Sequence, residues 1–73
     1  MFREHEQIVL TASAVGDAGE ELNPGDVGCV VHVHPGGQAA AVEFESADGE
    51  TSVIATVLAS HVHRVSQGDL TYV

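Results

Sequence analysis

Short apolar runs recur along this chain, and glycine, proline or acidic residues separate each run from the next. Within residues 39–45 the closing sequence Val-Glu-Phe-Glu alternates apolar and charged positions, which is the period of a half-buried strand. The other runs are rich in β-branched residues, which favour sheets. The predicted strands cover residues 6–11, 28–34, 39–45, 50–58 and 62–65.

Turn-forming residues stand between these strands. In Asn-Pro-Gly-Asp, Pro24 presets φ at the first central position and Gly25 supplies the positive φ needed at the second. Residues 35–37, Pro-Gly-Gly, and residues 48–49, Asp-Gly, predict two further turns. Residues 12–23 form a loop of about twelve residues, a length uncommon enough to indicate a contact surface.

The number and spacing of these strands predict an all-β fold, a five-stranded SH3-like small barrel with a long first loop. Residues 59–61 are expected to form a single helical turn before the last strand. We assign residues 1–65 to the barrel and residues 66–73 to a short C-terminal tail. A chain of 73 residues makes one domain and hides only about 60% of its unfolded surface.

The faces of the strands follow from their period of two residues. In the second strand we expect Cys29, Val31 and Val33 inside the barrel and Val30, His32 and His34 outside. Cys29 is then a buried, inert thiol, and as the only cysteine it cannot form an internal disulfide. In the third strand we expect Val42 and Phe44 inside.

The fourth strand is apolar on both faces. Val53, Ala55 and Val57 share one face, and Ile54, Thr56 and Leu58 share the other. A barrel has one interior, so the second face needs a cover. We expect a homo-oligomer interface there, formed by Ile54, Thr56, Leu58 and Val30. The alternative cover is the C-terminal tail, which carries Leu70, Tyr72 and Val73.

Charge narrows the classes of partner. Eleven acidic residues, two arginines and no lysine give a net charge of −9, which repels phosphate backbones and argues against nucleic-acid binding. Such a surface is steered toward basic proteins. No apolar run approaches the roughly eighteen residues that span a bilayer, and the N-terminus lacks the pattern of a signal peptide. We therefore expect a cytoplasmic protein without a membrane partner.

Histidines are the one constellation with candidate metal chemistry. His32 and His34, and likewise His61 and His63, are two residues apart and so lie on one face of a strand. If the pairs met, they would offer three or four nitrogen ligands for zinc or nickel. An alternating strand with a polar outer face produces the same pattern without a metal, so we assign no cofactor.

Several segments resemble a known family. These are Asn23-Pro24-Gly25-Asp26-Val27-Gly28, Val30-Val31-His32-Val33, Val42-Glu43-Phe44 and Asp48-Gly49-Glu50. They are similar to a family of very short bacterial proteins catalogued as a domain of unknown function. The resemblance implies a small β-barrel and members encoded beside toxin-like proteins, and it implies no catalytic residues. The glycine turn also resembles that of KOW-type ribosomal and transcription modules, from which this chain departs by lacking lysine.

Together these observations predict a function in binding rather than catalysis. No nucleophile stands at a recognisable spacing from a base, and no phosphate-binding loop is present, so we do not expect an enzyme. The predicted function is a non-catalytic protein-binding module, an antidote or accessory partner of a basic protein, acting as a homo-oligomer. The alternative is a small metal- or ligand-binding protein that uses the His-x-His pairs.

Overall fold

The computed structural model describes residues 2–45 and 52–65, which form an all-β fold. Its elements are β1 (Gln7–Leu10), β2 (Ala14–Val15), β3 (Glu21–Leu22), β4 (Val27–Val33), β5 (Ala39–Glu45), β6 (Ser52–Leu58), the 3₁₀ turn η1 (Ala59–His61) and β7 (Val62–Val65). The five predicted strands and the helical turn are confirmed. The predicted Asp48-Gly49 turn and the tail 66–73 lie outside the described residues. In the described part, no helix is long and apolar enough to cross a membrane.

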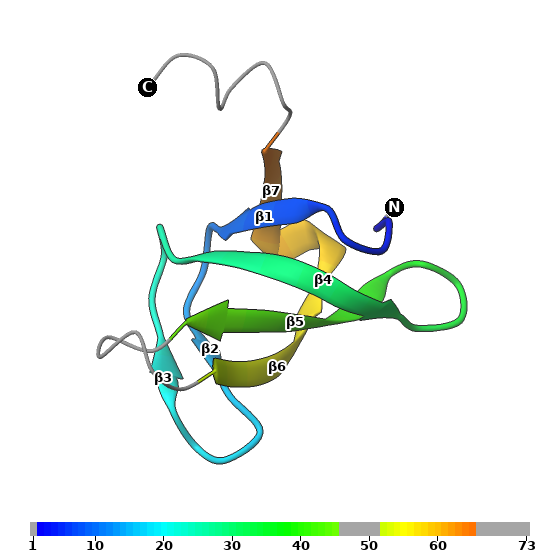
Figure 1. The fold of residues 1–73 in the computed structure, drawn as a ribbon. Helices are drawn as coiled ribbons and strands as arrows, with labels where there is room; N and C mark the ends of the chain where they lie inside the picture. Colours follow the sequence, from blue (N-terminus) through cyan, green and yellow to red (C-terminus); the bar gives the residue numbers. More distant parts are fainter. Residues whose placement is uncertain (1, 46–51, 66–73) are drawn as a thin grey trace.

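The main sheet is antiparallel and has five strands in the order β6-β5-β4-β1-β7 (Figure 1). β4, β5 and β6 follow one another as a meander, with Ala39 opposite Leu58 and Glu45 opposite Ser52. β1 joins this meander to the last strand, because it pairs with β4 on one side and with β7 on the other. The first and last strands of the described chain are therefore neighbours.

The turn before β4 is formed as its sequence predicts. Gly25 has a φ of 98°, the left-handed conformation that favours glycine. The Asp26 amide donates to the Asn23 carbonyl at 3.1 Å, and the Asn23 amide donates to the Asp26 carboxylate at 2.9 Å. Two further backbone bonds join the turn to Leu10 in β1: Gly25 N to Leu10 O at 2.8 Å and Leu10 N to Asp26 O at 2.9 Å.

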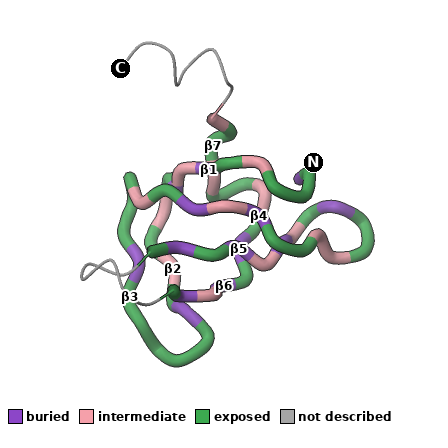
Figure 2. Tube along the Cα trace, in the orientation of Figure 1, coloured by how far each residue is buried: buried purple, intermediate pink, exposed green. Residues whose placement is uncertain are grey.

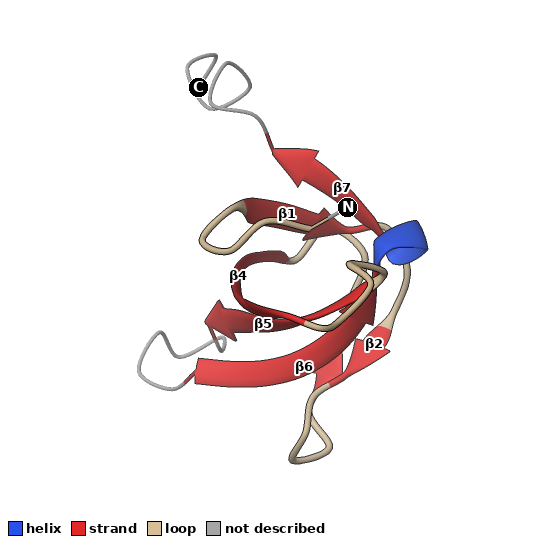
Figure 3. Cartoon of the chain, turned by 90° about the vertical axis from the view of Figure 1, so that its right-hand side faces the viewer, coloured by secondary structure: helices blue, strands red, loops and turns tan. Residues whose placement is uncertain are grey.

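The predicted loop 12–23 contains a two-stranded ribbon, β2–β3, which sequence patterning does not reveal. The ribbon lies beside β6 (Figure 3), where the Asp17 amide donates to the Ile54 carbonyl at 2.8 Å. Gly16 allows this approach, because a Cβ there would lie 2.5 Å from a methyl group of Val53. The ribbon thus shields part of the outer edge of β6.

The buried apolar residues form one core cluster, and Figure 2 marks the buried positions along the chain in purple. Its fully buried large side chains are Ile8, Leu10, Val30, Val42 and Phe44. Phe2, Leu22, Ala40, Val53, Ala55 and Val57 complete it. The inward positions predicted for the third strand and for one face of the fourth are confirmed.

The predicted facing of β4 is wrong at Cys29, Val30 and Val31, whereas His32 is exposed and Val33 packs against the core as predicted. Val30 is fully buried, whereas Cys29 is half-buried and Val31 is 41% exposed. Register explains this, because Val30 lies opposite the core residue Val42. A bulge between Val30 and His32 then shifts the alternation, which leaves Val33 half-buried. Val30 is therefore not part of an exposed interface, and Cys29 does not point into the core.

Candidate functional site

The two histidine pairs lie in different parts of the sheet. His32 is exposed on β4 and His34 is half-buried just after it, with their ring centroids 5.7 Å apart. His61 and His63 are exposed on η1 and β7, and His63 lies opposite Val9 of β1. β1 thus separates β7 from β4. Within residues 2–45 and 52–65 no three candidate ligands gather to hold a metal. The pairs do not meet.

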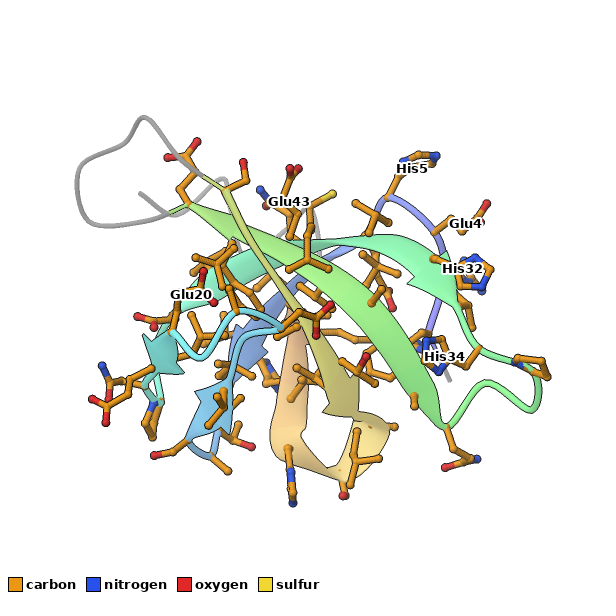
Figure 4. All side chains as sticks on the ribbon, turned by 90° about the horizontal axis from the view of Figure 1, so that it is seen from below. Glu4, His5, Glu20, His32, His34 and Glu43 are labelled. Atoms are coloured by element: carbon orange, nitrogen blue, oxygen red, sulfur yellow. The ribbon has the colours of Figure 1, made fainter. Side chains whose placement is uncertain are left out.

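A third histidine near the first pair was not singled out from the sequence. His5 has a φ of 70°, and its amide donates to the Val30 carbonyl at 2.7 Å. Histidine is among the non-glycine residues that tolerate this conformation best. Figure 4 shows His5 and Glu4 on the same side of the molecule as His32 and His34. The backbone bond makes His5 part of the entry into β1.

The outer face of the sheet carries three of the four residues predicted as an interface, because Val30 lies in the core instead. Thr56 is exposed, Leu58 is 48% exposed and Ile54 is half-buried. Glu43 stands next to Ile54 and is exposed, so a carboxylate interrupts the apolar positions. A shallow depression of about 360 Å³ lies on this face and is lined in part by Glu43, Cys29 and Gln7.

A second depression, of about 350 Å³, lies between β3, the turn 23–26 and the neighbouring ends of β5 and β6. We name it the acidic groove. Four carboxylates line it, those of Glu20, Glu21, Asp26 and Glu45. Its apolar lining comes from Leu22, Val27, Phe44 and Val53. No basic side chain is among its described lining residues. Such a groove is suited to a cationic group with an apolar stem.

Local hydrogen bonds hold two of the four carboxylates. The Ala18 amide donates to Glu20 Oε1 at 3.2 Å, and Asp26 accepts from Asn23 as described above. Glu21 and Glu45 are exposed on β3 and β5. The four acids come from three separate segments of the chain, so only the fold brings them together. The sequence indicated that Asp26 belongs to a turn and that Glu45 is a charged position of an alternating strand, but it did not indicate that the two residues share a groove.

Both arginines contact Glu6, which does not line the groove. Arg64 on β7 is within 3.4 Å of Glu6, measured from Nε to Oε1. The Arg3 backbone amide donates to the same carboxylate oxygen at 2.9 Å. In Figure 4, Glu20 lies on one side of the molecule and His5, His32 and His34 lie on the opposite side. Four of the eight acidic residues in the described part of the chain line the acidic groove.

Comparisons with known proteins identify a family without a known activity. Residues 4–64 match the family model described as "Domain of unknown function (DUF4926)". No curated protein and no solved structure matches the chain. The match covers the whole span from the entry into β1 to β7, including all four carboxylates of the acidic groove.

Proposed function

The chain belongs to the DUF4926 family, a family of unknown function, and we propose that it is a non-catalytic protein-binding module whose partner is a basic protein. The observation that carries this proposal is the gathering of Glu20, Glu21, Asp26 and Glu45 around one groove without a basic lining residue. Complementary charge raises the rate of encounter and excludes partners of like charge. The same charge disfavours nucleic acid as the partner.

The proposed scaffold is a closed SH3-like barrel. The order of elements supports it: a first strand, a ribbon in the long loop, a three-stranded meander, one 3₁₀ turn and a last strand beside the first. The ribbon lies beside the edge strand β6, and β7 forms the opposite edge next to β1. We propose that the protein acts in the bacterial cytoplasm as an antidote or accessory partner of a basic protein.

Co-expression tests this function. The tagged chain is expressed with the product of each reading frame that flanks its gene, and complexes are isolated by size exclusion. We expect a basic product to co-purify at low salt and to dissociate as salt rises, because screening weakens contacts between exposed charges. If the partner is a toxin and this protein is its antidote, co-expression also restores the growth of cells that the partner alone inhibits. A bound product that is itself acidic, or a complex insensitive to salt, contradicts the proposal.

Self-association is a second candidate, favoured by the exposure of Leu58 and Val31 on the outer face. A dimer formed by this face would bury Ile54 and Thr56 but would also bring Glu43 of each copy out of water, which is costly without a cationic partner. The molar mass measured by light scattering during size exclusion tests whether the protein forms this dimer. A dimer that Leu58→Asp converts to a monomer supports this interface, and a monomer at all concentrations removes it.

A further inference from the structure

The lining of the acidic groove has two chemical parts. Leu22, Phe44 and Val53 contribute to it although each is more than nine-tenths buried. Val27 is 51% exposed and is the main apolar surface open to a ligand. Apolar surface left open in this way favours a ligand segment of several methylene groups, each of which stabilises the complex when it leaves water.

Four carboxylates stand around that apolar surface. A neutral aliphatic ligand would gain nothing from them and would remove some of their water. An ammonium or guanidinium group would instead make charge-assisted hydrogen bonds, which are stronger than those between neutral groups. Long basic side chains combine both parts, because their stem packs on apolar surface while the charged head stays with water or with an acid.

We propose that the acidic groove binds an arginine or lysine side chain of the basic partner, with the stem along Val27 and the cationic head among Glu20, Glu21, Asp26 and Glu45. This inference rests on the proposed function and specifies where and how the partner is held. A basic side chain in the groove brings a positive charge beside these carboxylates, and salt weakens this attraction by screening. One basic residue of the partner is then an anchor, and its neutralisation weakens the complex.

A nuclear magnetic resonance titration tests the groove directly. The ¹⁵N-labelled protein is titrated with acetyl-Gly-Arg-Gly-Arg-Gly-amide, and separately with the same peptide carrying citrulline, which keeps the shape of arginine but not its charge. We expect the arginine peptide to shift the amide signals of residues 20–23, 25–27, 44–45 and 53, and the citrulline peptide to leave them in place. Absence of binding by the arginine peptide, or equal shifts with both peptides, overturns the proposal.

Matched charge variants separate the groove from general attraction. Glu21→Gln with Glu45→Gln removes two groove charges without touching the carboxylates that hold the backbone at Ala18 and Asn23. Glu4→Gln with Glu43→Gln removes two exposed charges that do not line the groove. We expect the first pair to raise the Kd of the arginine peptide at least about fivefold and the control pair less than about twofold. Equal effects of the two pairs overturn the groove as the site.

The outcomes also distinguish the inference from the function on which it rests. If the flanking basic protein binds but shifts only amide signals of residues outside the groove in the labelled chain, the groove proposal fails and the protein-binding function stands. If no basic protein binds while the arginine peptide still occupies the groove, the function fails and the site stands. Unchanged signals from the rest of the sheet in each variant show that the fold is intact.

Discussion

Gly28 is the position where the packing of this small core can be tested most sharply. A Cβ added there would lie 2.5 Å from Val42 Cγ1 and 2.7 Å from Cε2 of Phe44. Both neighbours are almost completely buried, and valine is stiff at χ1, so neither side chain has room to move away. The Gly28→Ala substitution therefore forces overpacking in the middle of the sheet.

The expected cost follows from two opposing effects. A Gly→Ala substitution with free space stabilises a protein by about 0.4–1 kcal/mol, because it restricts the unfolded chain. Overpacking of a core costs about 1–3 kcal/mol. We therefore expect a net loss of about 1–2 kcal/mol. Since each kcal/mol moves the melting temperature of a small domain by about 4–8 °C, the loss is readily measured.

Urea unfolding followed by circular dichroism measures this loss, and a second background identifies its cause. In a Phe44→Leu protein the ring carbons are gone, so the Gly28→Ala substitution is expected to cost about 1 kcal/mol less than in the wild type. Contact with Val42 remains in that background, so part of the cost persists. A Gly28→Ala protein as stable as the wild type, or more stable, would refute the reasoning.

Two further predictions concern neighbouring residues of β4. Val30→Ala is expected to destabilise the protein by about 2 kcal/mol, because its buried methyl groups leave a cavity, while Val31→Ala changes stability by less than about 0.5 kcal/mol. Urea midpoints of the two variants measure the difference, and equal losses would contradict the facing described for this strand. Zinc is expected to leave the melting temperature unchanged, because in the described part of the chain His32 and His34 lie close together but no three candidate ligands gather. If zinc raised the melting temperature by several degrees in a saturable way, and His34→Ala abolished that rise, the prediction would be wrong and a metal site would be indicated.

The five strands of the main sheet were predictable from the sequence because residues with strong turn chemistry stand between several of them, whereas β2 and β3 were not predictable. Pro24 and Gly25 mark the turn before β4, and the structure forms it as expected. The face of β4 was not predictable, because apolar residues stand on both of its sides. Only the register with Val42 selects Val30 for the core, and the bulge that follows leaves no mark in the sequence.

The candidate site was less accessible to sequence reasoning than the fold. Net charge indicated a basic partner, but it does not show where on the surface that partner would bind. The histidine pairs were conspicuous because the two residues of each pair are only two positions apart in sequence, but sheet order places β1 between β4 and β7. The acids of the groove are separated along the chain, and Glu45 joins Glu20 and Glu21 only through the packing of the ribbon near the ends of β5 and β6.

The pairing of β1 with β7 has a consequence for how the chain folds. The meander of β4, β5 and β6 involves contacts between neighbours in sequence, whereas Gln7 finds Val65 at the far end of the described chain. Closing so large a loop costs entropy before any contact compensates for it. We expect the meander to form early and the last strand to dock late. Truncation before Val62 would then leave β1 with one unpaired edge, open to pairing with another chain.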